Sequence, residues 1–225
     1  MKKYVSLLVT TLILASGIIT GCSKSADKVL VDSLDKTKVV NSVEINLTSS
    51  SKSNGQTFET KMNMKTEDLK ENIKTKVEVE KSGQKQEFYL AKSNNDIKMY
   101  AKDMSGKYNA SSLDSSQVYG MDAEKSFNAY IEVIKNNPDM IKKTGDNTYE
   151  LNVPKEKADG IYSKVAGKNA PQSLDSFKVE FAIGDDEYIK SVNIKLTSGS
   201  IEAESKSEYS NFNKEFDIVI PEVSK

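Results

Sequence analysis

The chain has 225 residues, 32 of them basic, and a formal net charge of −1 at pH 7. This balance excludes the basic footprint of a nucleic-acid-binding protein. Every basic residue is lysine, histidine is absent and there is one cysteine, so a catalytic triad, most zinc sites and an internal disulfide are disfavoured. We therefore expect a protein that uses neither a metal nor a cofactor.

The first 22 residues have the layout of a secretory signal. Lys2 and Lys3 precede an uncharged apolar run, Val5–Ile19, which is shorter than the roughly 20 residues of a permanent membrane-spanning helix. The run ends in Ile19-Thr20-Gly21-Cys22, which resembles the lipobox of bacterial lipoproteins. In those proteins the cysteine becomes the diacylglyceryl-modified first residue of the mature chain. The alternative, a buried core cysteine, leaves its position at the end of a signal segment unexplained.

This resemblance implies a division of the chain and a location. We expect residues 1–21 to be a lipoprotein signal peptide, residues 22–27 a lipidated tether and residues 28–225 a single domain. The acylated Cys22 is expected to hold the protein on the extracytoplasmic face of the cell membrane. Two acyl chains anchor a protein stably, because each buried CH₂ contributes ~0.8 kcal/mol.

The mature chain opens with a helix and continues with alternating runs. Asp27 is a suitable cap for a helix through about Thr37, whose Leu30, Val31 and Leu34 form an apolar stripe. From there the hydrophobic period changes to two, which predicts strands with one apolar and one polar face. We expect strands at residues 42–48, 58–65, 73–80, 88–90 and 97–101. Short turns separate these strands, so neighbouring strands are expected to pair as antiparallel hairpins.

The middle of the chain changes pattern after an expected loop at Asn109–Gly120. Helical spacing predicts a helix from Asp122 to about Lys135 and a second short helix over Pro138–Lys143. A strand is expected at Thr148–Val153. Another helix is expected from Pro154 to just before Gly167, because proline suits the first turn of a helix and glycine its end.

The last third returns to alternation. Phe177–Ile183, Tyr188–Leu196 and Ile201–Tyr209 predict three more strands, and the run Phe216–Ile220 alternates in the same way before Pro221. The apolar faces of about nine or ten strands must then be buried. Three or four helices are too few to cover the whole apolar face of so wide a sheet. We therefore expect an α+β fold in which a strongly curved antiparallel sheet, a half-barrel, wraps over a few helices and leaves apolar space between them.

The candidate ligand cavity is predicted from the apolar rows of these strands. Methionine is unbranched and suits a site for flexible acyl chains. The alternative is that the same side chains simply fill the core. The candidate residues are Val43, Ile45, Leu47, Phe58, Met62, Met64, Val77, Val79, Phe88, Leu90, Met99, Phe177, Val179, Phe181, Val192 and Ile194.

Three segments resemble Gram-positive lipoproteins related to the mycobacterial LppX/LprG group, whose domain is LolA-like. They are the Ser/Thr-rich strand Lys38–Ser50 after the opening helix, the hairpin Gln86–Lys102 followed by Gly106-Lys107-Tyr108, and the closing run Tyr209–Pro221. Relatives often have tryptophan where this chain has Tyr108. The resemblance implies a half-barrel over a helical lid, with a hydrophobic cavity that carries lipids or lipidated molecules in relatives.

The expected function is therefore that of a non-enzymatic, membrane-anchored lipoprotein that binds or carries a lipid or other apolar ligand, as a monomer. The alternative is an envelope interaction or scaffold lipoprotein with a filled core, acting through its charged strand faces or the Asn109–Gly120 loop. A carboxylate enzyme would need acid pairs such as Asp185-Asp186 or Glu202 and Glu204, which the pattern places on a turn and a solvated strand face. A solute receptor of an importer would need two α/β lobes, which this strand order excludes.

Overall fold

The computed structural model describes residues 24–70, 72–81, 83–93, 96–114, 123–167 and 173–223. The expected signal peptide, Cys22 and the expected helix cap Asp122 lie outside these residues. In the described part of the chain, no helix is long and apolar enough to cross a bilayer.

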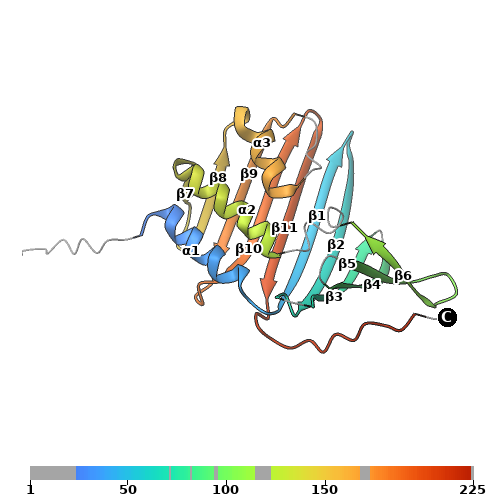
Figure 1. Cartoon of the computed structure of the whole chain (residues 1–225). Helices are drawn as coiled ribbons and strands as arrows, with labels where there is room; N and C mark the ends of the chain where they lie inside the picture. Colours follow the sequence, from blue (N-terminus) through green and yellow to red (C-terminus); the bar gives the residue numbers. More distant parts are fainter. Residues whose placement is uncertain are drawn as a thin grey trace, which may run out of the picture.

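Eleven strands of the described chain form one antiparallel sheet (Figure 1). Their order is β6-β5-β4-β3-β2-β1-β11-β10-β9-β8-β7, so the first and last strands of the chain pair at the centre of the sheet. The strands are β1 (Val43–Ser53), β2 (Gln56–Glu67), β3 (Lys74–Lys81), β4 (Gln84–Ser93), β5 (Asp96–Lys102), β6 (Tyr108–Leu113), β7 (Ile141–Lys143), β8 (Thr148–Val153), β9 (Ser176–Ile183), β10 (Ile189–Ser198) and β11 (Ile201–Ser210).

The helices gather over one side of this sheet. They are α1 (Ala26–Lys38), α2 (Ala123–Asn136) and α3 (Lys155–Ala166), with a short 3₁₀ turn, η2, at Pro138–Met140. In Figure 1 they lie over the β7–β11 side, and strands β3–β6 curve away from them. The predicted α+β half-barrel, a strongly curved antiparallel sheet wrapped over a few helices, is confirmed.

Three local predictions were wrong. The short helix expected over Pro138–Lys143 is the 3₁₀ turn η2 followed by β7, because Ile141 pairs with Leu151 of the next strand, β8. Part of the loop expected at Asn109–Gly120 belongs to β6, which pairs with β5 although its residues are mostly small and polar. The rest of that loop lies outside the described residues.

The third difference is the alternating run Phe216–Ile220, which is not a strand in the structure. Its alternation is nevertheless real, because Ile218 is buried while Val219 is 78% exposed. The backbone N–H groups of Phe216 and Ile218 donate to the carboxylate of Glu67 at 3.3 and 3.0 Å. The segment after β11 therefore runs along the lower edge of the molecule in Figure 1, beneath β3–β6, held by a side chain in place of a strand ladder.

The buried residues form two hydrophobic clusters. The helix-side cluster joins the apolar faces of α1, α2 and α3 to strands β7–β10, with Leu34, Ile134 and Leu151 fully buried. The second cluster, which we call the open-side cluster, consists of Val40, Val43, Ile45, Met64, Val77 and Leu90. The sheet thus has two parts. The helices cover β7–β10, and the open-side cluster lies on β1–β4 away from them.

Candidate functional site

The strand register aligns the apolar residues of the open side in rows across one face. Ile45 pairs with Tyr209 on one side and Met64 on the other, and the row continues through Val77 to Phe88. We call the face that carries this row the inner face. A second row runs parallel to it through Ser207, Leu47, Met62, Val79 and Gln86.

The helices cover only part of the inner face. α1 packs on β7, β9 and β10, and α3 packs on β8 and β9, whereas α2 lies against α1 and α3. The principal contacts of these helices with the sheet are therefore with β7–β10. On the open side, Leu47, Met62, Val79, Phe88 and Met99 are only half-buried.

The structure divides the candidate cavity residues between the two clusters. Phe177, Val179, Phe181 and Val192 lie in the helix-side cluster, where the ring of Phe181 contacts Tyr130 at 5.2 Å between centroids. Ile194 packs against that cluster from its edge. These five residues lie in the core that the helices cover. The other candidates lie on the open side of the sheet.

The remaining candidates lie on the inner face of β1–β5. Val43, Ile45, Met64, Val77 and Leu90 are buried in the open-side cluster, and Met62, Val79, Phe88 and Met99 pack against it. Phe58 lies farther along β2, near the β1–β2 turn, and is 55% exposed. Whether a ligand contacts these residues stays a prediction.

Tyr209 lies at the boundary between the two clusters and was not among the candidates. Its ring contacts Phe127 of α2 at 5.4 Å between centroids and packs against both clusters. Burial raises the pKa of Tyr209 to about 12, although a hydrogen bond from Ser207 acts in the opposite direction. The sequence signal was its place in the Ile201–Tyr209 alternation, where it shares a face with Ser207.

The opposite, outer face is charged. An open trough of about 440 Å³ runs across β1–β4 between rows of polar side chains that include Asn46, Asn63 and Glu78. A second trough of about 530 Å³ crosses β8–β11 and β1–β2 and has Lys52, Lys178, Lys195, Asp175, Glu202 and Glu204 among its lining residues. Both troughs are open and have charged side chains in their lining, whereas the apolar rows lie on the inner face.

The carboxylates of the outer face are held by donors. Glu87 accepts hydrogen bonds from Tyr89 and Tyr108 and pairs with Lys76 at 2.8 Å. The hydrogen bond from Lys76 lowers the pKa of Glu87 most, and burial raises it in part. Burial, with Glu87 adding to it, raises the pKa of Tyr89 to about 12.

The two acid pairs considered for catalysis have the same character. Asp186 pairs with Lys190 at 3.1 Å, and Glu204 pairs with Lys195 at 3.4 Å. In the described part of the chain, no group of three or more histidine, cysteine, aspartate or glutamate side chains is placed to hold a metal ion. Asp186 and Glu204 therefore act as partners of lysines on the surface.

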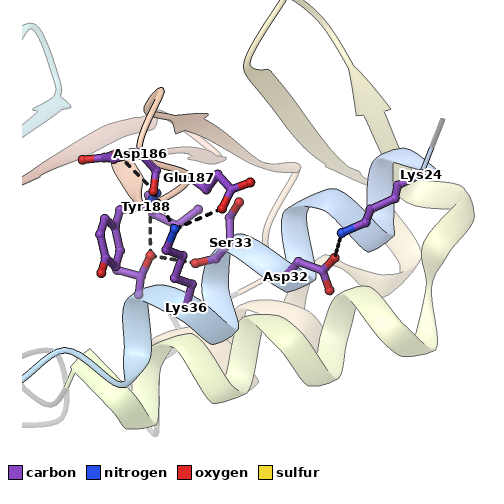
Figure 2. Close-up of polar contacts among 9 residues, drawn as sticks. Lys24, Asp32, Ser33, Lys36, Asp186, Glu187 and Tyr188 are labelled. Carbon is purple, nitrogen blue, oxygen red and sulfur yellow. Dashed lines mark hydrogen bonds and ion pairs between the residues drawn. The ribbon is translucent and has the colours of Figure 1, made fainter.

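The helix that follows the expected tether is fastened to the sheet by the β9–β10 turn (Figure 2). Lys36 donates to the carbonyl oxygen of Asp186 at 2.8 Å and to the carboxylate of Glu187 at 3.0 Å, and its ammonium lies 4.9 Å from the ring centroid of Tyr188. At the other end of α1, Lys24 pairs with Asp32 at 2.6 Å. The side chain of Lys24 thus reaches along the first turns of α1 to Asp32.

The comparisons with known proteins agree with this architecture. Neither a scan against protein-family models nor a search of curated proteins finds a match. Among solved structures, LprF from Mycobacterium bovis superposes with a TM-score of 0.50 at 11% identity, covering 88% of this chain and 96% of LprF. The chain has the fold of LprF.

Two further structures superpose over most of their length. The lipoprotein LppX from Mycobacterium tuberculosis gives a TM-score of 0.48 at 15% identity, with 86% of this chain and all of LppX covered. A LolA-superfamily protein from Nitrosomonas europaea gives 0.32 at 9% identity, with 84% and 93% covered. The predicted resemblance to mycobacterial lipoproteins is confirmed at the level of fold by the superposition on LprF.

Proposed function

We propose that this protein is a membrane-anchored lipoprotein that binds a lipid or another apolar ligand on the inner face of β1–β5. The observation that carries the proposal is the unequal cover of the sheet. The helices pack on β7–β10, whereas the apolar side chains of Met62, Val79, Phe88 and Met99 are left half-buried. Apolar surface left partly in water is stabilised when it is covered, by about 25 cal/mol for each Å².

The residue types on this face suit an acyl chain. Met62, Met64 and Met99 have flexible, polarisable side chains that adapt to irregular shapes. The aliphatic residues between them offer only dispersion contacts, so they discriminate little among hydrocarbon chains. We infer non-enzymatic binding, because the carboxylates Glu78, Glu87 and Glu204 pair with lysines and lie on the other side of the sheet.

The proposed anchor fits the beginning of the described chain. Helix α1 begins at Ala26, four residues after Cys22, and Lys24 is already tied to Asp32. A tether this short keeps the start of α1 within about 14 Å of an acylated Cys22, since an extended chain spans at most about 3.6 Å per residue. The domain would then stay beside the membrane, where acyl ligands are available.

Lipid content is the direct test. The chain from Ser23 onward keeps every described residue and is to be made in a bacterial host, purified without detergent and analysed by native mass spectrometry and lipid extraction. We expect a bound species with an acyl chain, released by denaturation. A protein that is consistently empty, and that takes up no lipid from vesicles, would contradict the proposal and favour an envelope scaffold with a filled core.

A further inference from the structure

The inner face changes from apolar to polar along the strands. The row Tyr209–Ile45–Met64–Val77–Phe88 is apolar, and the next row has Ser207 and Gln86 at its ends. One step farther toward the β1–β2 and β3–β4 turns, the row consists of Ser205, Ser49, Thr60, Lys81 and Gln84. This gradient suits an amphiphilic ligand in one orientation. Its acyl chains would lie near Ile45 and its head group near Thr60.

Charge on this part of the sheet is segregated by face. The register places the glutamates of β1–β4, which are Glu44, Glu59, Glu67, Glu78, Glu80 and Glu87, on the outer face. In the described residues of β11 and β1–β6, the inner face carries no carboxylate. Lys81 is the charged residue of the polar row, and Lys92 lies at the opposite, apolar end of β4.

Lys81 differs from the neighbouring lysine of the same hairpin. Lys85 lies on the outer face, where it pairs with Glu80 at 3.8 Å. Lys81 is exposed on the inner face, where its cross-strand neighbours are the uncharged Thr60 and Gln84. Directly opposed residues in a sheet have Cβ atoms about 5 Å apart, so one small group can contact Lys81 and the Thr60 hydroxyl together.

We propose that the bound amphiphile has a singly anionic head group, a phosphodiester or a carboxylate, held by Lys81 with the hydroxyls of Thr60 and Ser49. Its acyl chains lie over Met62, Val79 and Phe88. An ammonium and two hydroxyls supply donors to the oxygens of such a head, and among the described strand residues of this face there is no carboxylate to repel it. This inference rests on the proposed function and adds to it the class of ligand.

The test uses the full-length protein in phosphatidylcholine nanodiscs that contain one of three photoactivatable lipids. Phosphatidylglycerol, free fatty acid and diacylglycerol probes carry the same diazirine acyl chain, and peptide mass spectrometry measures labelling of the inner face. We expect both anionic probes to label at least about fivefold more than diacylglycerol. Lys81→Gln should lower their labelling to the diacylglycerol level, and Lys81→Arg should retain it.

Lys85→Gln is the matched control, because it removes the same charge four residues away on the other face. Equal labelling by the anionic probes and diacylglycerol, or equal effects of Lys81→Gln and Lys85→Gln, would overturn the head-group assignment and leave the proposed function standing. If none of the three probes labels the inner face, the proposed function fails together with this inference. Preference for one anionic probe identifies which head, phosphodiester or carboxylate, the site takes.

Discussion

The hydroxyl of Thr37 joins the last turn of α1 to the first residue of β10. It donates to the carbonyl oxygen of Ser33 at 2.7 Å and accepts from the backbone N–H of Ile189 at 2.9 Å. The β9–β10 register shifts immediately after Ile189, so this amide lies at an irregularity of the ladder. Thr37 and Ile189 are both buried, and the contact therefore fixes α1 against the sheet where the helix-covered half ends.

Thr37→Val should lower the free energy of unfolding by about 1–3 kcal/mol, because it leaves the buried amide of Ile189 without an acceptor. Thr37→Ser keeps the hydroxyl and should cost less. Urea unfolding followed by circular dichroism measures both variants. Equal stabilities of the valine and serine variants would show that the hydrogen bond to Ile189 contributes nothing.

The C-terminal segment offers a test of packing without a strand. Ile218 is 7% exposed and Val219 is 78% exposed, although they are adjacent. Ile218→Ala should destabilise the protein by about 2–4 kcal/mol through lost burial and a cavity, whereas Val219→Ala should change stability by less than about 0.5 kcal/mol. Thermal unfolding of the two variants decides this, and similar melting temperatures would mean that the segment does not pack on the sheet.

Glu44 predicts a pH dependence of stability. Burial raises the pKa of Glu44, but hydrogen bonds from Asn63 and Asn211 and the nearby Lys65 and Lys214 outweigh it, so the net pKa is lowered. A carboxyl group whose pKa is lower in the folded state stabilises the fold above its unfolded pKa, and this contribution is lost as the pH falls through the folded value.

Glu44→Gln should therefore cost about 1 kcal/mol at pH 7 and much less at pH 3. Urea titrations of both proteins at the two pH values measure the difference. A cost that is the same at pH 3 and pH 7 would assign the effect to shape and not to charge.

Cys22 is the proposed point of attachment to the membrane. Cys22→Ala should release the protein from the membrane fraction or leave it as the unprocessed precursor, because the acyl group has no other thiol to join. Metabolic labelling with a clickable fatty acid and cell fractionation follow both effects. Unchanged labelling and fractionation of the variant would refute the assignment.

The two-residue hydrophobic period predicted the architecture because most strands have one polar, solvent-facing side and one apolar side. Val43, Ile45 and Leu47 alternate with polar residues, and their row is indeed the inner face of the central strand. The β6 strand lacked this signal, since Asn109, Ala110, Ser111 and Ser112 are all exposed and the pairing with β5 alone defines it. Ile141–Lys143 is likewise a strand because of its partner and not because of its own sequence.

The candidate site was predicted only as a set of apolar rows. Alternation distinguishes an inner face from an outer face, but it does not tell which strands the helices cover. Phe177 and Met62 therefore looked alike in the sequence, whereas the structure buries Phe177 under α3, against Tyr162, and leaves Met62 half-buried. The boundary between covered and open halves depends on contacts such as Phe127 with Tyr209, which join residues far apart in the chain.

The central claim is that acyl chains lie on the inner face of the open side, and a fluorescent reporter tests it most directly. The chain has no tryptophan, so Met62→Trp and Lys61→Trp place single reporters on adjacent residues of opposite faces. Lipids brominated in their acyl chains quench tryptophan on contact. We predict strong quenching of Met62→Trp and little of Lys61→Trp, whereas equal quenching of the two, or none at Met62→Trp, would contradict the account.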